Sequence, residues 1–240
     1  MFRHEGKTRN FKHNLGIASL LSFVAGLVNV TGFLSVQKLT TNITGHFAYL
    51  IDEVFKLEWL NSLVYFLYIF FFFLGSFTSN LLIEIALRKH SKISYQIPVF
   101  LESFILLALA FLGAMMASES PNFLAFVLLF SMGLQNALVT KISKATVRTT
   151  HLTGLFTDLG IELSQLIFYK LPEQQAQLWS SVKLRLTIIS FFFLGGITGG
   201  VFYMRIGLKV LLLAALVLIS TIVYDFLKYH WLLFHRRHRA

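Results

Sequence analysis

The sequence predicts an all-α membrane protein whose six transmembrane helices form two inverted repeats of three helices. Three observations lead to this fold class. Of the 240 residues, 56% are hydrophobic and only 13% are charged, against about 25% charged residues in a soluble domain. The apolar residues gather in six runs that are close to the roughly 20 residues a spanning helix needs. The stretch at residues 40–47 is echoed at 149–156, which indicates a duplicated unit.

Each half of the chain supplies three of the apolar runs. The predicted spans are Leu15–Val36, Leu60–Leu87, Tyr95–Met116, Phe123–Val139, Leu186–Met204 and Leu211–Leu227. A polar loop is predicted over 170–185, before the fifth span. The chain is therefore predicted to be one transmembrane domain over residues 1–240, with repeat one at about 15–116 and repeat two at about 123–228.

The distribution of positive charge predicts how these spans are oriented. If both termini are cytoplasmic, all but four of the 21 lysines and arginines fall in cytoplasmic segments, the exceptions being Lys38, Lys56, Arg205 and Lys209. This bias follows the positive-inside rule. We therefore expect the net charge of +10 to reflect contact with the lipid bilayer and not with nucleic acid. The chain has no cysteine, which excludes disulfides, thiol catalysis and cysteine-based metal sites.

The internal repeat extends well beyond the eight-residue motif. In register with it, Gly26–Asn29 matches Gly133–Asn136, and Phe71–Gly75 matches Phe191–Gly195. Because three spans are an odd number, the second unit enters the membrane from the opposite side, which makes the repeat inverted. Inverted repeats are typical of secondary transporters, whose solute sites lie where the repeats meet. The alternative is that the duplication is only a relic within a structural protein.

The repeated motif predicts a break in the chain followed by a short re-entrant or interfacial helix after the first span of each repeat. Thr44 and Thr153 are the predicted N-caps, and Gly45 and Gly154 allow close backbone approach. A helix that starts within the membrane offers free N–H groups and the positive end of its dipole to an anionic or carbonyl-bearing ligand. The alternative is two ordinary turns at opposite membrane surfaces.

These considerations define a predicted substrate-binding set drawn from both repeats. It comprises Asn29, Thr40, Thr41, Thr44, Gly45, Gln135, Asn136, Thr149, Thr150, Thr153 and Gly154. The asparagines and the glutamine lie within spans, where such side chains also join helices by hydrogen bonds. Both roles remain open for them at this stage.

Three glutamates, Glu53, Glu102 and Glu162, are candidates for ion or proton coupling because intramembrane acids are rarely structural. Glu53 could equally be a solvated loop acid, and Glu102 could pair with Arg185, Arg148 or an asparagine. No histidine or acid cluster with metal-ligand spacing occurs, so no metal is expected. No catalytic constellation occurs either, so we expect neither a cofactor nor an enzyme.

The residues of both halves resemble the YoaK-like family of uncharacterised bacterial multi-pass membrane proteins. The resemblance rests on G-L-V-N-V-T-G-F and T-T-N-I-T-G-H in the first half, and on S-M-G-L-Q-N-A and V-R-T-T-H-L-T-G in the second. It implies a bacterial inner-membrane protein with six spans and no settled activity. The family's usual pattern has an aspartate near Asn29, so any cation or proton role of that acid does not carry over to this chain.

The leading functional prediction is a secondary transporter of a small polar or anionic solute, working by alternating access at a site between the two repeats. The alternative is a membrane-embedded scaffold or sensor that binds a lipid or protein partner without transport. A transporter should have a polar cavity lined by both motif copies, whereas a scaffold should be packed dry there. The sequence leaves a homo-oligomer open.

Overall fold

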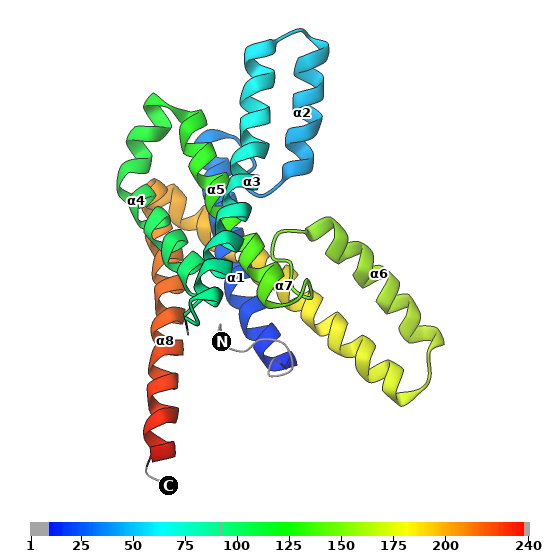
Figure 1. Ribbon diagram of the computed structural model, residues 1–240. Helices are drawn as coiled ribbons and strands as arrows, with labels where there is room; N and C mark the ends of the chain where they lie inside the picture. The colour runs from blue at the N-terminus through cyan, green and yellow to red at the C-terminus, as the bar shows by residue number, and fades with distance from the viewer. Residues whose placement is uncertain (1–9, 92, 238–240) are drawn as a thin grey trace.

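The computed structural model describes residues 10–91 and 93–237 and, in that part of the chain, it is entirely helical. Its helices are α1 (Phe11–Val36), α2 (Ile43–Phe55), α3 (Trp59–Arg88), α4 (Ile97–Glu119), α5 (Pro121–Ile142), α6 (Leu152–Phe168), α7 (Pro172–Ile206) and α8 (Leu211–Arg237), with a single 3-10 turn, η2 (Gly207–Val210), before α8 (Figure 1). The all-α prediction is confirmed for these residues. The short helices predicted after the first span of each repeat are α2 and α6.

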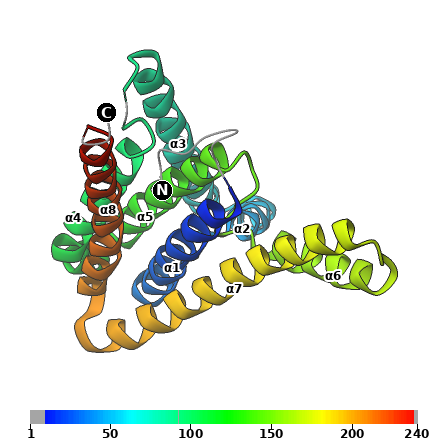
Figure 2. The same cartoon turned by 90° about the horizontal axis from the view of Figure 1, so that it is seen from below.

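Five segments of the described chain are long and apolar enough to cross a membrane. They contain α1, α3, α4 and α5, and a fifth segment, 172–228, that runs through both α7 and α8. The break within the fifth segment lies at Gly207, whose φ of 58° and ψ of −142° suit only glycine. The 3-10 turn follows, and α8 then returns beside α4 (Figure 2).

The first long helix of each half packs against the long helix that follows the short one in the other half. Helix α1 lies against α7, and α5 lies against α3. The crossings use glycines of the repeated blocks: a Cβ on Gly26 would overlap the carbonyl oxygen of Phe192, and one on Gly133 would overlap that of Phe72. Small residues at such crossings let the backbones of membrane helices touch. Helices α1 and α5 contribute more residues to the main buried core than the other described helices do.

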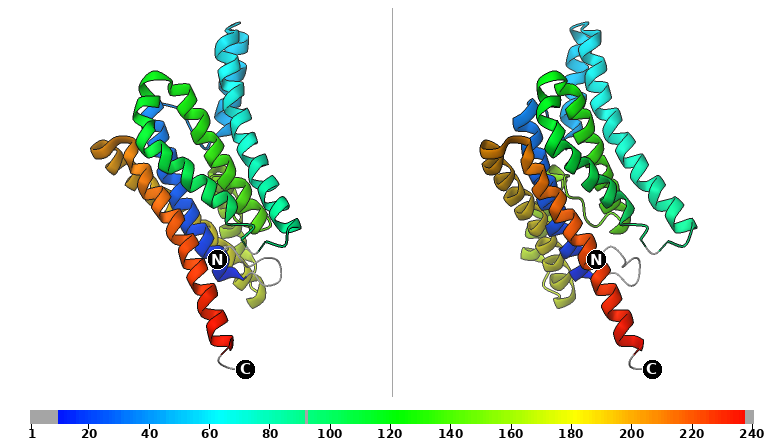
Figure 3. Two further views of the ribbon diagram at one scale, coloured as in Figure 1. Left: turned by 60° about the vertical axis from the view of Figure 1, so that its left-hand side comes forward. Right: turned by 90° about the vertical axis from the view of Figure 1, so that its left-hand side faces the viewer.

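Each short helix folds back along the start of the long helix that follows it. Helix α2 packs on α3, and α6 packs on α7. The α2–α3 hairpin extends toward one end of the molecule, and the α6–α7 hairpin extends toward the other end, where α1 begins and α8 ends (Figures 1 and 3). The first residues of α2 and of α6 therefore both lie near the middle.

One prediction about the elements is wrong. The stretch 170–185, expected to be a polar loop, is mostly the first half of α7, which begins at Pro172. Proline suits the first turn of a helix because it has no N–H to pair. Glu173 lies in the same turn, where the positive end of the helix dipole stabilises its negative charge. In this half of α7, Ser181 and Arg185 contact Glu162 on α6, and most of the other polar residues are exposed.

Candidate functional site

A single pocket of about 920 Å³ lies at the middle of the molecule and is lined by both copies of the repeated motif. We call it the central pocket. From repeat one it is lined by Asn29, Leu39, Thr41, Asn42, Ile43, Thr44, Gly45, Ala48 and Phe72, and from repeat two by Asn136, Thr140, Arg148, Thr150, His151, Leu152, Thr153, Gly154 and Phe192. The two motif copies therefore meet at one site and do not lie at separate surfaces.

Two matched hydrogen bonds fix the polar walls of this pocket. The hydroxyl of Thr41 donates to Oδ1 of Asn29 at 2.8 Å, and the hydroxyl of Thr150 donates to Oδ1 of Asn136 at 2.8 Å. In each repeat, a long helix supplies the asparagine and the loop before the short helix supplies the threonine. The amide nitrogen of Asn136 also donates to the carbonyl of Met132 at 3.0 Å. The two bonds from Thr41 and Thr150 each join a motif copy to the helix that precedes it.

The N-cap residues of the two short helices lie two residues before the threonines predicted to cap them. Asn42 is the N-cap of α2, and its Oδ1 accepts a hydrogen bond from the backbone N–H of Gly45 at 3.1 Å. His151 is the N-cap residue of α6, with no side-chain cap bond. The prediction that Thr44 and Thr153 are the caps is therefore wrong. Both threonines lie in the first turn, exposed to the pocket.

The glycine of each motif leaves room for the side chain of the N-cap residue. A Cβ on Gly154 would overlap the imidazole of His151, which lies over the first turn of α6. A Cβ on Gly45 would stand 3.4 Å from the Asn42 amide nitrogen, a tight contact. The nearest group at both glycines is thus a side chain of the N-cap residue and not the close backbone approach that we expected.

Three residues of the predicted set do not line the central pocket. Thr40 and Thr149 occupy equivalent positions, and both are fully buried with hydroxyl oxygens that have no partner among the described residues. Gln135 is also buried, and its amide nitrogen donates to the carbonyl of Leu21 at 2.6 Å, which joins α5 to α1. For Gln135 the geometry therefore supports the helix-joining role, one of the two left open by the sequence.

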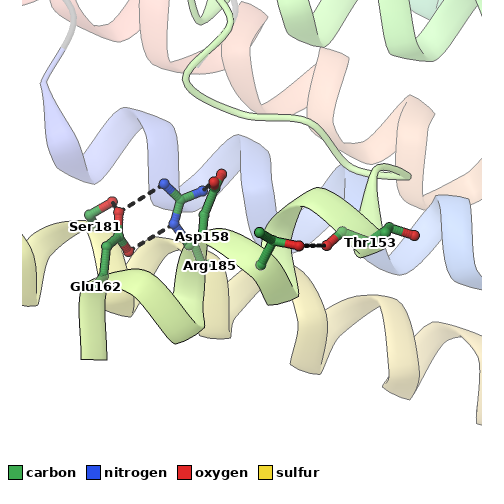
Figure 4. A network of polar contacts seen from close by, with 6 residues as sticks. Thr153, Asp158, Glu162, Ser181 and Arg185 are labelled. Carbon is green, nitrogen blue, oxygen red and sulfur yellow. Dashed lines mark hydrogen bonds and ion pairs between the residues drawn. The ribbon is translucent and has the colours of Figure 1, made fainter. Parts of the chain in front are cut away.

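A smaller space of about 430 Å³, the α6–α7 cleft, adjoins the central pocket and shares Arg148, His151 and Gly154 with it. An ion-pair cluster lines its far side. Arg185 of α7 binds Glu162 of α6 through Nε and Nη2, at 2.8 Å each, and its Nη1 lies 2.9 Å from Asp158 (Figure 4). We call these contacts the α6–α7 clamp.

The protonation state of the clamp follows from its contacts. Burial alone would raise the pKa of Glu162, but hydrogen bonds from Arg185 and from the hydroxyl of Ser181, at 2.6 Å, outweigh burial and hold the pKa below its ordinary value. Glu162 is therefore a carboxylate at neutral pH and serves as the anionic half of an ion pair. Its candidacy for proton coupling has no support from this geometry.

The matching region of repeat one has different chemistry. Tyr49 stands at the repeat position of Asp158 and Tyr65 at that of Arg185, and their rings stack with centroids 5.2 Å apart. His46 is buried beside them, with its Nε2 2.6 Å from the carbonyl oxygen of Leu39. Helix α2 is thus held to α3 by packed rings, where the other repeat has an ion-pair cluster and an open cleft.

The other two glutamates lie outside both pockets. Glu102, on α4, is fully buried, and neither of its carboxyl oxygens has a partner among the described residues, so the suggested pairing with Arg185, Arg148 or an asparagine is wrong. Glu53 lies 3.6 Å from Lys56 on α2. Within the described part of the chain, no three histidine, aspartate or glutamate side chains are grouped as a metal site would require.

Sequence reasoning missed Arg148 as a pocket residue. It was counted among the basic residues of a cytoplasmic loop, although it directly precedes the second Thr-Thr pair. That position was an available signal, because the matching residue of repeat one is the uncharged Leu39 and a charge present in only one copy marks a difference between the two halves.

Comparison with known proteins identifies a family and a transmembrane relative of the chain. The model of a family described as "Protein of unknown function (DUF1275)" matches residues 17–224. The UPF0700 transmembrane protein YoaK of Bacillus subtilis is 28% identical over 185 residues, which cover 75% of this chain and 80% of that protein. No solved structure matches. The resemblance predicted from the sequence is confirmed.

Proposed function

The chain belongs to the DUF1275 family of membrane proteins, and we propose that it is a secondary transporter that moves a small polar or anionic solute without changing it chemically. The observation that carries this proposal is the central pocket, where equivalent polar residues of the two repeats line one space. Sites between repeats, formed at the starts of broken helices, are the usual solute sites of such transporters.

The proposed arrangement has six spans in two inverted repeats, with both termini in the cytoplasm of a bacterium and the chain in its inner membrane. The fifth apolar segment counts as two spans because Gly207 breaks it into α7 and α8. Inversion is supported by the two short-helix hairpins, which extend toward opposite ends of the molecule (Figure 3). It is also supported by the reciprocal crossings of α1 with α7 and of α5 with α3.

Alternating access is supported by the difference between the two hairpins. The central pocket continues into the α6–α7 cleft on one side. On the other side, the rings of His46, Tyr65 and Tyr68 fill the matching region, with the His46 and Tyr68 centroids 4.9 Å apart. A pocket open toward one surface and closed toward the other is one of the two states that alternating access requires. A scaffold without transport would have no need of such a pocket.

The test is uptake of solutes into liposomes that contain only the purified protein. Small carboxylates, phosphate and neutral polyols are supplied in turn, and currents recorded on a solid support detect the transport of charge. We expect at least one solute to give saturable uptake. The double substitution Thr44→Val with Thr153→Val should reduce that uptake at least tenfold, because both hydroxyls are exposed to the pocket and make no bond that holds the fold.

Thr157→Val is the matched control, because Thr157 lies on α6 outside the pocket and is also exposed. It should leave uptake unchanged. Equal melting temperatures of the three proteins would show that the double variant is folded. The transporter proposal is wrong if no solute in the panel enters above the rate of protein-free liposomes, or if the double variant transports like the wild type.

A further inference from the structure

The charge of the central pocket is carried by one side chain. Arg148 lies in the loop between α5 and α6 and lines both the central pocket and the α6–α7 cleft, where it is exposed. Among the described residues it has neither an ion-pair partner nor a hydrogen-bond partner. Arg185, in the same cleft, differs because Asp158 and Glu162 already neutralise it. Arg148 is therefore the arginine at this site whose guanidinium is free to bind another group.

Among the described residues that line the central pocket none is acidic, so no side chain there carries a charge that would favour a cation. The starts of α2 and α6 both border it, and the N-terminal end of a helix carries about half a positive charge. These contributions have the same sign as Arg148. Asn29 adds a side-chain amide whose oxygen is already occupied by Thr41, which leaves its nitrogen to donate. The polar part of the described lining thus includes hydrogen-bond donors, and its charge is positive.

We propose that the solute of the central pocket is a small soluble anion whose carboxylate or phosphate group is held by Arg148. This inference rests on the proposed function and narrows its substrate class. A planar guanidinium binds the two oxygens of such a group at once, which gives both strength and orientation. At about 920 Å³, the pocket is within the usual size of a small-molecule site, so it can also hold the uncharged part of the solute.

The competing explanation is that Arg148 is only one of the basic residues that orient the chain in the membrane. Lys144 tests this explanation directly. It is exposed, lies in the same loop and carries the same charge, but it lines neither pocket. A general electrostatic or topological effect should appear equally on removing either charge, whereas a binding effect should appear only at Arg148.

The experiment measures the melting temperature of the purified protein in a neutral detergent while sodium lactate, sodium succinate or sodium phosphate is titrated in. Lactamide and succinamide are the neutral analogues of the two carboxylates. Sodium chloride is the control for the effect of added salt. A ligand that binds the folded state raises its stability by mass action. We expect at least one anion to raise the melting temperature saturably, while its neutral counterpart has no effect.

Three variants then locate the anion. Arg148→Gln should weaken the apparent affinity at least tenfold, as expected for a lost charge-assisted hydrogen bond, and Arg148→Lys should fall between it and the wild type because lysine lacks the planar fork. Lys144→Gln should bind like the wild type. The inference is overturned if Arg148→Gln also binds like the wild type, if the neutral analogues bind equally well, or if none of the soluble anions stabilises the protein.

A further arm separates a soluble anion from a lipid headgroup, because both can present a phosphate. Phosphatidylglycerol is added to the detergent in place of the salts, and stabilisation by this lipid alone would overturn the assignment to a soluble solute. The liposome assay keeps the two proposals apart. Arg148-dependent binding of an anion without uptake would refute transport but support the anion site. Uptake of neutral solutes without anion binding would support transport but refute the anion site.

Discussion

Glycines at the helix crossings determine how closely the two repeats can approach. Gly26 of α1 faces the carbonyl of Phe192 on α7, and Gly195 of α7 faces the carbonyl of Phe23 on α1. The same arrangement recurs between α3 and α5. At these positions the obstacle to a larger residue is backbone, which cannot move aside as a flexible side chain can. A substitution must therefore separate the two helices.

We predict that Gly26→Ala lowers the stability of the protein, because the new methyl group would overlap the carbonyl oxygen of Phe192. Overpacking of this kind costs about 1–3 kcal/mol. The measurement is the melting temperature in detergent. Gly200→Ala is the control, because its Cβ would meet only the Val30 side chain, at an ordinary 3.5 Å. Equal loss of stability in both variants would contradict the crossing geometry.

A second prediction at the scale of single residues concerns His46 and pH. Burial lowers the pKa of His46 below 6.5. The hydrogen bond to Leu39 partly offsets this decrease in the pKa, and the positive charge of Lys38 adds to it. As the pH falls, the unfolded chain therefore binds the proton before the folded protein does. The stability that depends on neutral His46 is complete above a pH of about 6.5 and is lost as the pH falls through the folded pKa.

Melting temperatures at about pH 8 and about pH 5.5 measure this effect. We expect the wild type to lose more stability between these values than His46→Gln, because glutamine can donate to the Leu39 carbonyl and does not titrate. Other histidines titrate in both proteins, so only the difference between them reports on His46. The same pH dependence in both proteins would show that protonation of His46 does not matter.

At the scale of elements, the two short helices are held by unlike contacts at like positions. Asp158 and Arg185 join α6 to α7 by charge, whereas Tyr49 and Tyr65 join α2 to α3 by stacked rings. Ion pairs beside a water-accessible cleft exchange readily with water, and packed aromatic rings do not. The α6–α7 hairpin should therefore open more easily than the α2–α3 hairpin.

We predict that Arg185→Gln releases α6 from α7. The substitution removes both contacts with Glu162 and the contact with Asp158, leaving two neighbouring carboxylates without a cation. Backbone amide exchange of α6 should accelerate about tenfold, the effect of roughly 1.4 kcal/mol in local opening. Exchange of α2 should not change.

Lys56→Gln, on α2, is the comparison for this prediction. Lys56 pairs with Asp52 on the same helix, with more than half of each side chain exposed, and such surface pairs contribute little. Its removal should leave exchange of both short helices close to that of the wild type. If Arg185→Gln and Lys56→Gln behave alike, the clamp does not hold α6 in place.

The elements also show which parts of the fold the sequence could predict. Apolar runs located the spans because lipid requires about 20 apolar residues from any helix that crosses it. The polar first half of α7 was missed because only apolar runs were read as helices, and its contacts with α6 are polar ones that hydropathy does not reveal. The caps were misplaced by two residues because Asn42 and Thr44 are both good N-cap residues, and only the loop geometry selects between them.

At the scale of the whole molecule, the repeat was the most informative feature of the sequence. It brought Asn29, Thr41 and their partners from repeat two to one pocket, because equivalent positions of two packed units meet near their common axis. Two aspects of the site escaped prediction. Thr40 and Thr41 differ only in how the loop orients their side chains, which buries Thr40 and exposes Thr41 to the pocket. The lack of a partner for Arg148 depends on where each acidic residue lies in the fold.

The last prediction tests the inverted arrangement itself, with single cysteines introduced into this naturally cysteine-free chain. The sites are Glu58 before α3, Glu119 at the end of α4, Lys89 after α3 and Lys170 before α7, and all four residues are exposed. Glu58 and Lys170 are the critical pair, because they lie in the turns that join α2 to α3 and α6 to α7, at the tips of the two short-helix hairpins. These hairpins extend toward opposite ends of the molecule (Figure 3). In an inverted repeat, an odd number of spans separates the tips, so they must lie on opposite sides of the membrane.

In intact cells, an impermeant maleimide should label the cysteines at 58 and 119 directly, and those at 89 and 170 only after the membrane is opened. Labelling of 58 and 170 from the same side would exclude the inversion and, with it, a solute site that alternates between the two surfaces.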